Sequence, residues 1–167
     1  MTDYYSTIAA GYDELYGQEQ DDKLRQLLLR HEPIIYSSLL DVGCGTGRSH
    51  TLLPQIKWQG IDPSPGLIAH SHEDIRKKII CCKGEKLPFP NSMFNYVLSL
   101  TALQNFDDPN TGLIEMNRVL KPDGILLLSF LKRGETAQSI IPMVAEHFIV
   151  IEHWEDSKDF FFVAKKK

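Results

Sequence analysis

The sequence predicts a single α/β domain in which helices cover both faces of one mostly parallel sheet. Short apolar runs alternate with amphipathic stretches along the 167 residues, as they do in successive βαβ units. One run, ILLLSFL at 125–131, is apolar throughout, as expected of a strand that is buried on both faces. The length is close to that of one ordinary domain, so separate cofactor and substrate domains are not expected.

The individual elements follow from local signals. Strands are predicted at 38–42, 56–62, 78–82, 94–100, 125–131, 147–154 and 159–165, the last two as an antiparallel pair. Helices are predicted between them at 46–53, 65–77, 109–120 and 135–146. Pro65 and the basic RKK at 76–78 suit the two ends of the second helix. The Lys-Pro-Asp-Gly sequence at 121–124 is predicted to end the third helix.

The composition excludes several classes of protein. The chain carries 18 Lys and Arg against 22 Asp and Glu, a formal charge of -4, so no overall basic field would hold a nucleic acid. No apolar run is long enough to span a membrane, and the first residues lack the pattern of a signal peptide. Cys44, Cys81 and Cys82 show no disulfide or metal spacing, and the histidines are scattered. We therefore expect a cytoplasmic protein without a metal site.

The strongest functional signal is LLDVGCGTG at 39–47, a predicted strand followed at once by three glycines and a predicted helix. Glycines let the backbone turn tightly and approach a ligand at a helix N-terminus. The spacing is G-x-G-x-G rather than the dinucleotide G-x-G-x-x-G. Asp41 precedes the first glycine by two residues, and Asp62 ends the next strand, where a carboxylate can accept both ribose hydroxyls of a nucleoside.

These motifs resemble those of class I S-adenosylmethionine (SAM) methyltransferases, in particular the group similar to the ubiquinone and menaquinone biosynthesis enzymes (methyltransferase type 11). The resemblance covers nearly the whole chain, through YYSTIAAGYDELY, DVGCGTG, GIDPS, KGEKLPFPNSMFNYVLS and NRVLKPDGILLLSF. It implies SAM as cofactor, S-adenosylhomocysteine as product, and a Rossmann-like seven-stranded sheet of order 3-2-1-4-5-7-6 with strand 7 antiparallel. Residues 1–30 would form an N-terminal helical lid, and residues 37–167 the core of one methyltransferase domain.

The resemblance also implies roles for individual residues. The glycine loop would pass under the methionine moiety of SAM, Asp41 would lie near its amino group, and Asp62 would hold the ribose. Tyr5 and Tyr12 fall on one helical stripe and either pack on the sheet edge or cover the cofactor and exclude water. The cofactor-binding set is then Tyr5, Tyr12, Asp41, Gly43, Cys44, Gly45, Gly47, Asp62, Pro63, Gly84, Glu85, Lys86 and Leu100.

One position departs from the family pattern. The family has an Asp after strand three that meets the exocyclic amine of adenine, and this chain has Lys83. Lysine only donates hydrogen bonds and so cannot accept one from that amine. Glu85, a backbone carbonyl, or apolar packing by Pro63, Leu87 and Pro88 remain as alternatives.

The segment after the fourth strand, LTALQNFDDP, lies where ligands bind in parallel sheets. Gln104, Asn105 and Phe106 are therefore predicted to contact the methyl acceptor. Asp107 and Asp108 precede a proline, which favours capping of the next helix over a role as general base. The Asn-Pro-Pro-aromatic signature of enzymes that methylate amides or exocyclic amines is absent from the sequence. Because positioning can supply much of the acceleration of an in-line methyl transfer, no catalytic residue is predicted.

Two surface features concern macromolecular partners. Arg76, Lys77, Lys78, Lys83 and Lys86 gather around the third strand and form either a solvated face or a patch for structured RNA. The third strand, with the apolar run IICC, is also the predicted sheet edge, where a partner protein can add a strand. Some relatives of this architecture work with a small zinc-binding activator docked on that edge.

The sequence predicts a methyltransferase without identifying its acceptor, which is a small molecule, an RNA or a protein. The rival hypothesis is a non-catalytic SAM-binding or scaffold subunit, which the loss of the adenine-binding Asp at position 83 favours and the intact positions 41–47 and 62 oppose.

Overall fold

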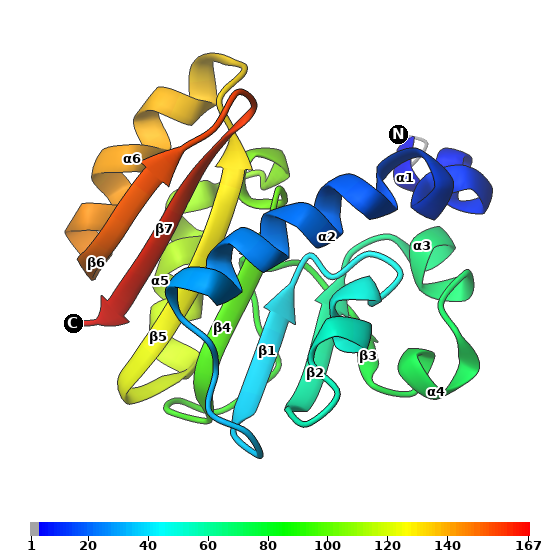
Figure 1. Cartoon of the computed structure of the whole chain (residues 1–167), viewed down its shortest axis with the longest axis horizontal. Helices are drawn as coiled ribbons and strands as arrows, with labels where there is room; N and C mark the ends of the chain where they lie inside the picture. Colours follow the sequence, from blue (N-terminus) through cyan, green and yellow to red (C-terminus); the bar gives the residue numbers. More distant parts are fainter. Residues whose placement is uncertain (1–3) are drawn as a thin grey trace.

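A computed structural model describes residues 4–167, except for the side chain at position 135. Seven strands form one sheet of order β3-β2-β1-β4-β5-β7-β6 (Figure 1). Strands β1 to β5 pair in parallel, and β7 is antiparallel to both β5 and β6. The predicted fold class, strand order and closing antiparallel pair are therefore confirmed.

The strands are β1 (Ser38–Val42), β2 (Lys57–Asp62), β3 (Ile79–Cys81), β4 (Phe94–Leu100), β5 (Leu120–Leu131), β6 (Phe148–Glu155) and β7 (Asp159–Lys166). The α-helices are α1 (Tyr4–Ile8), α2 (Tyr12–Arg30), α3 (Pro65–Ala69), α4 (Glu73–Arg76), α5 (Pro109–Val119) and α6 (Glu135–His147). Short 3₁₀ helices are η1 (Ala9–Gly11), η2 (Arg48–Leu52) and η3 (Leu103–Asn105). None of the described helices combines the length and the apolar composition that a membrane crossing requires.

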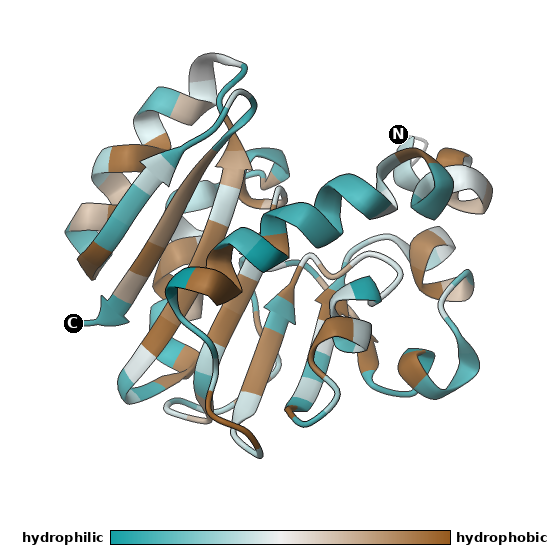
Figure 2. Cartoon of the chain, viewed as in Figure 1, coloured by the Kyte–Doolittle hydropathy of each residue, from teal (hydrophilic) through white to brown (hydrophobic). Residues whose placement is uncertain are grey.

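The core has two layers because successive side chains of a strand point to opposite faces of the sheet. On one face, Leu39 and Leu98 pack with Leu24 and Leu27 of α2, which crosses the sheet in Figure 1. On the other face, Leu40 of β1 belongs to the core cluster that includes residues of α5 and α6. Figure 2 shows the corresponding apolar colouring along the central strands. Burial on both faces explains why the central strands are apolar without alternation.

Besides shifts of one residue at the ends of several elements, three predicted elements differ from the structure. The expected helix at 46–53 is the short 3₁₀ helix η2. The expected helix at 65–77 is two helices, α3 and α4, separated at 70–72; there the Arg76 guanidinium donates to the carbonyls of Ala69 and Ser71, both at 2.8 Å. The fifth strand begins at Leu120 rather than 125, and residues 121–124 bulge out of its pairing with β4.

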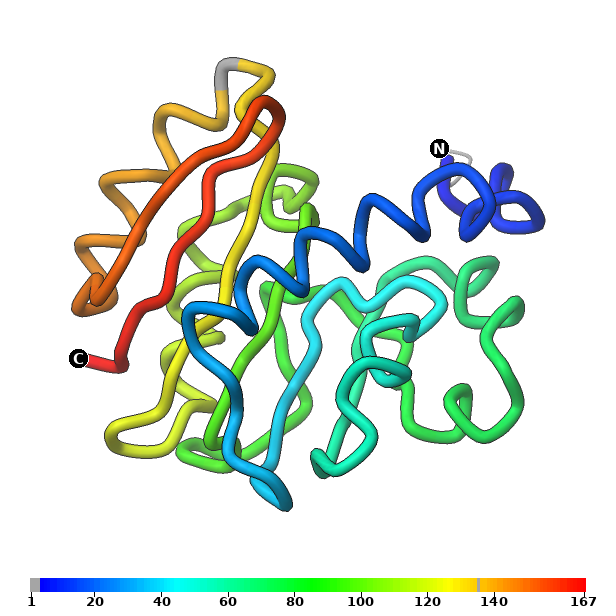
Figure 3. The backbone as a smooth tube through the Cα atoms, in the orientation of Figure 1, coloured from blue at the N-terminus to red at the C-terminus, as the bar shows by residue number. Residues whose placement is uncertain are grey.

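The N-terminal segment packs on the end of the sheet toward which β1 and β2 point. Figure 3 shows it beside the turn that contains α3. The Ser6 hydroxyl accepts a hydrogen bond from the amide of Gly66 at 3.0 Å, and a Cβ at Gly66 would come within 2.3 Å of that hydroxyl. Helix α1 is thereby fixed to α3. The first three residues of the predicted lid, 1–3, lie outside the described part of the chain.

Candidate functional site

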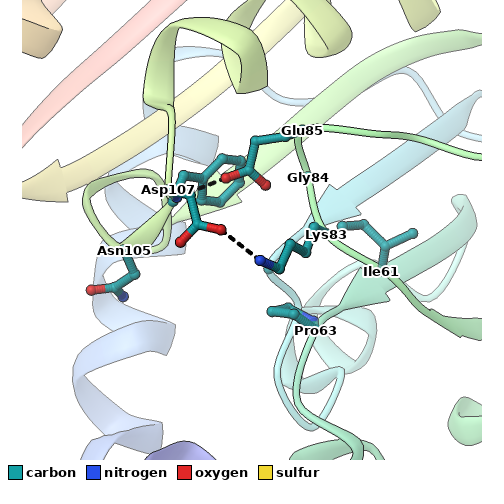
Figure 4. Close-up of a pocket in the computed structure, with 9 residues that line it drawn as sticks. Ile61, Pro63, Lys83, Gly84, Glu85, Asn105 and Asp107 are labelled. Carbon is teal, nitrogen blue, oxygen red and sulfur yellow. Dashed lines mark hydrogen bonds and ion pairs between the residues drawn. The ribbon is translucent and has the colours of Figure 1, made fainter. Parts of the chain in front are cut away.

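Connected hollows lie above the C-terminal ends of β1, β2 and β4. The central cavity, of about 80 Å³, is lined by Tyr5, Tyr12, Gly43, Gly45, Asp62, Pro63, Leu67, Leu100, Thr101, Ala102, Asn105 and Phe106. The loop cavity, of about 60 Å³, is lined by Gly43, Ile61, Pro63, Lys83, Gly84, Glu85, Asn105, Phe106 and Asp107 (Figure 4). The tyrosine cavity, of about 180 Å³, is lined by Tyr4, Tyr5, Tyr12, Tyr16, Glu19, Gln20, Thr101, Gln104, Asn105 and Leu131. These hollows share lining residues and form one site.

Asp62 lies at the floor of the central cavity, and 5% of its surface is exposed. Its Oδ2 accepts a hydrogen bond from the Gly45 amide at 2.8 Å, and its Oδ1 accepts one from the Ser64 amide at 2.8 Å. The two amides fix the plane of the carboxylate, and a carboxylate oxygen can accept more than one hydrogen bond. The arrangement suits a ligand that presents a pair of hydroxyls.

The three glycines of the 43–47 loop all have positive φ, between 56° and 79°, and they serve different purposes. A Cβ on Gly43 would lie 2.4 Å from the Ala102 Cβ, and one on Gly47 would lie 2.4 Å from Ile75. A Cβ on Gly45 would meet only Tyr12 and Leu67, at 3.7 and 3.8 Å, and would project into the central cavity. Gly45 thus leaves room for a ligand, while Gly43 and Gly47 allow close packing of their neighbours.

Asp41 is the second buried carboxyl of the site, with 3% of its surface exposed. Burial, offset in part by a hydrogen bond donated by the Ser49 hydroxyl and reinforced by the nearby Asp62 charge, raises the pKa of Asp41 to about 7. Asp41 lines a small hollow behind the glycine loop together with Cys44 and Arg48. Burial and the charges of both Asp residues also raise the pKa of the Cys44 thiol, which stays protonated. A cationic group is the ligand that this environment favours.

Helix α2 is fixed over the glycine loop by two polar contacts. The Arg48 guanidinium donates to both oxygens of Asp21, from Nε at 2.8 Å and from Nη2 at 2.9 Å. The Thr46 hydroxyl donates to Asp13 Oδ1 at 2.8 Å. Gly17 makes room for the guanidinium, since a Cβ there would lie 2.8 Å from it. These contacts hold Tyr12 above Gly45, an arrangement that the sequence did not reveal.

Tyr5 and Tyr12 cover the central cavity, with ring centroids 6.2 Å apart. The Tyr5 hydroxyl accepts a hydrogen bond from the Asn105 amide at 2.8 Å. Burial raises the pKa of both phenols, most strongly for Tyr12, so neither ionises near neutral pH. The two rings therefore cover the cavity without supplying a base.

The predicted acceptor residues have different surroundings. Asn105 and Phe106 line both the central and the loop cavity. Gln104 faces the tyrosine cavity, but its amide donates to the carbonyl of Thr101 at 2.7 Å and so supports the backbone. Asp108 caps α5, as expected, by accepting hydrogen bonds from the amides of Asn110 and Thr111.

The remaining predicted residues can also be placed. All members of the predicted cofactor set except Gly47 and Lys86 line one of the hollows. Of the apolar residues named as alternatives for adenine packing, Pro63 lines the loop cavity, whereas Leu87 belongs to the core beside α5. In the basic cluster, Lys77 is paired with Glu73 and Lys83 with Asp107. No group of three or more His, Cys, Asp or Glu within the described residues could hold a metal ion.

A buried ion pair that the sequence did not predict lies beside the site. Lys23 of α2 and Asp159 of β7 lie 3.0 Å apart, with 3% and 0% of their side chains exposed. The Thr101 hydroxyl accepts from Lys23 at 3.1 Å and donates to Asp159 at 3.0 Å. Thr101 has a φ of 50°, which is a rare conformation for a β-branched residue. The position of Thr101 directly after β4 could have marked it as a candidate site residue. Its two partners could not be predicted, because Lys23 and Asp159 are distant from it in the sequence.

Residues 40–128 match the model of a family described as a methyltransferase domain. The chain is 32% identical over 138 residues to the malonyl-[acyl-carrier protein] O-methyltransferase of Hahella chejuensis, covering 78% of this chain and 49% of that protein. The chain spans about half the length of the curated relatives it matches.

Two of the solved structures that share the fold are methyltransferases. One is a methyltransferase in complex with the Trm112 activator of Haloferax volcanii (TM-score 0.81, 17% identity, 99% of each chain covered). The other is the N-methyltransferase NodS of Bradyrhizobium japonicum in complex with S-adenosyl-L-homocysteine (TM-score 0.71, 18% identity, 89% of this chain and 86% of that chain covered). At these identities the likeness concerns the fold.

Proposed function

This chain belongs to the class I SAM-dependent methyltransferase family, and from that premise we propose that it transfers a methyl group from SAM to a small acceptor bound in the tyrosine cavity. The observation that carries the proposal is the pair of buried carboxyls, Asp41 and Asp62, on either side of the positive-φ glycine loop. A ligand with a cation at one end and a ribose diol beside it satisfies both carboxyls.

The residues present fit SAM. Asp62 would hold the ribose hydroxyls, Gly45 leaves room for the methionine chain, and Asp41 would pair with the ammonium group. The loop cavity, next to the central cavity, would take the adenine. When bound, the cofactor supplies an electrophilic methyl group on a sulfonium centre. Because Asp41, Gly45 and Asp62 are all present and in place, they argue against a scaffold subunit that has lost cofactor binding.

The tyrosine cavity is the acceptor side of the proposed site. It joins the central cavity through their shared lining residues Tyr5, Tyr12, Thr101 and Asn105. Tyr5 and Tyr12 exclude water from the junction, and Asn105 and Phe106 fix the direction of approach. Because both phenols stay protonated, the residues of this chain would act by alignment, which can supply much of the rate of an in-line transfer. The lid would thus consist of α1 and the start of α2, which carry Tyr5 and Tyr12, whereas Leu24 and Leu27 hold the rest of α2 in the core.

The test is transfer of a radiolabelled methyl group from SAM into an extract of source cells, separated into acid-soluble and acid-precipitable fractions. The proposal expects label in the soluble fraction that is lost with Asp62→Ala and kept with Asp74→Ala, whose side chain is 83% exposed on α4. Label in the precipitate that nuclease or protease removes would contradict a small acceptor. Label that does not depend on Asp62 would contradict the proposed site.

A second candidate is a catalytic subunit that needs a small activator on β3. This strand is an edge of the sheet, and its Ile80 is 39% exposed. The similar fold seen with the Trm112 activator supports the idea. We expect a Trm112-type protein to raise methyl transfer by this chain and Ile80→Lys to abolish that gain. Ile149→Lys, on the opposite edge strand β6, is the matched control because Ile149 is 52% exposed. An equal loss with both variants would contradict a β3 interface.

A further inference from the structure

The loop cavity has an unusual ion pair at its rim. Lys83 follows β3 and Asp107 follows β4, and Figure 4 shows their side chains meeting across the opening. The Lys83 Nζ donates to Asp107 Oδ2 at 2.5 Å. Both residues line the cavity, and their side chains are 64% and 76% exposed. The pair is therefore available to a ligand that enters between the two loops.

The loop after β3 holds both the backbone and the carboxylate of Asp107, through Glu85 and Lys83. Glu85 Oε1 accepts hydrogen bonds from the amides of Asp107 at 2.8 Å and Asp108 at 3.3 Å. Glu85 therefore fastens the two loops together. Lys83 fixes one oxygen of the Asp107 carboxylate, and Oδ1 accepts no hydrogen bond from the described residues. An oriented acceptor is thus left at the rim of the cavity.

The cavity walls suit a flat ring. Ile61, Pro63 and Gly84 come from the β2 and β3 side, and Phe106 comes from the β4 side. A Cβ on Gly84 would lie 2.3 Å from the Phe106 ring, so the glycine is needed for the ring to sit there. The cavity shares Gly43 and Pro63 with the central cavity, whose floor is Asp62. Because Gly84 and Phe106 touch, they form one wall, and a nucleoside with its ribose at Asp62 would place its base between that wall and Pro63.

We propose that Asp107 recognises the exocyclic amine of the adenine, and that Lys83 is a positioning residue that holds the Asp107 carboxylate. An amine donates hydrogen bonds, which an ammonium cannot accept and a carboxylate can. With its charge paired to Asp107, Lys83 ceases to oppose the amine and supports its acceptor. The inference deepens the proposed function and rests on it. It makes this site selective for 6-amino over 6-oxo purines.

The test compares calorimetric binding of S-adenosylhomocysteine with that of S-inosylhomocysteine, in which a carbonyl oxygen replaces the amine. The wild-type chain is expected to prefer the adenosyl compound by about 10- to 100-fold, the range of one hydrogen bond to a charged group. Asp107→Ala should reverse the preference, because the released Lys83 can donate to the carbonyl. The double variant Lys83→Ala/Asp107→Ala should bind the two compounds about equally.

Two controls keep the outcomes distinct. Asp74→Ala removes a carboxylate of similar exposure, 83%, from α4 and should keep the wild-type preference. Thermal unfolding of each variant shows that it folds. An Asp107→Ala chain that binds with the wild-type preference would overturn the inference alone. A wild-type chain that binds neither compound would overturn the proposed function and the inference with it.

Discussion

The side-chain amide of Asn105 donates a hydrogen bond of 2.8 Å to the phenol oxygen of Tyr5, across 100 positions of sequence. The bond joins the first helix to the loop after β4, directly over the central cavity. Tyr5 also packs edge-on against Tyr12, with ring centroids 6.2 Å apart. A ligand in the central cavity would therefore be covered from two sides, and we expect this contact to open when the ligand exchanges.

Removing the Tyr5–Asn105 hydrogen bond should speed ligand release. In Tyr5→Phe the ring stays and the acceptor is lost, so the lid opens more often, and we expect binding of S-adenosylhomocysteine to weaken by about 3- to 10-fold. Stopped-flow measurement of dissociation checks this. Asn105→Ala should have the same effect, and the double variant should add little to either. Tyr36→Phe, with 67% of the residue exposed, is the control; additive losses at Tyr5 and Asn105 would contradict a shared contact.

Asp41 should make ligand binding dependent on pH. The pKa of Asp41 in the folded protein, about 7, lies above its value in the unfolded chain, about 4. Between these two pH values the folded state binds more protons than the unfolded state. The contribution of Asp41 to the free energy of unfolding therefore falls as the pH rises from about 4 to about 7. An ammonium group pairs only with the ionised carboxylate. Binding of S-adenosylhomocysteine should therefore tighten by about 10-fold between pH 6 and pH 8.

Asp41→Asn removes the titrating group and should flatten both profiles. Its thermal stability relative to wild type should improve as the pH rises from 4 to 7. Isothermal titration at several pH values and thermal unfolding measure the two effects. A slope in binding that persists in Asp41→Asn would assign the pH dependence to another group.

The glycine loop offers a matched series of substitutions. Gly43→Ala combines a positive φ with a 2.4 Å approach to Ala102 and should lower the free energy of unfolding by about 2–5 kcal/mol. Gly45→Ala should cost less stability but weaken cofactor binding, because its methyl group enters the central cavity. Gly134→Ala tests backbone strain alone, since its φ is 100° and nothing lies within 4 Å of the added Cβ. Urea unfolding measures the loss of stability, and calorimetry measures the loss of cofactor binding. If Gly43→Ala and Gly45→Ala had the same ratio of binding loss to stability loss, the different roles assigned to the two glycines would be wrong.

Breaking the buried Lys23–Asp159 pair should be strongly destabilising. Asp159→Ala removes the buried partner of Lys23, whose side chain is 3% exposed, and leaves only Glu19, at 2.8 Å, as its acidic partner. Because Glu19 still compensates the ammonium in part, we expect a loss of about 3 kcal/mol in the free energy of unfolding, at the lower end of the range for a broken buried pair. Lys23→Met/Asp159→Leu should recover most of it, because no charge remains buried. Lys77→Ala, from an exposed pair, should change little. A double variant no more stable than Asp159→Ala would show that packing, not charge, is responsible.

Local patterns determined most of the architecture. The apolar runs located all seven strands, because burial periodicity is recorded in neighbouring residues. The strand and glycine loop, with Asp41 and Asp62, indicated the candidate site, which remains a prediction. The order of the strands followed from the family resemblance. The predicted helix at 65–77 was wrong because the chain turns at 70–72, where the Arg76 guanidinium donates to the carbonyls of Ala69 and Ser71, contacts that helix propensity does not report.

Only the tertiary structure decided which distant residues meet. Asn105 with Tyr5, Lys23 with Asp159 and Lys83 with Asp107 each join separate elements of the chain. In the sequence, Lys83 stands where the family has an Asp that accepts a hydrogen bond from adenine, so an acceptor is missing at that position. The fold brings the carboxylate of Asp107, from the loop after β4, next to Lys83. The physical reason is that the identity of a side chain fixes what it can donate or accept, while the packing of strands and loops fixes which partner comes within reach.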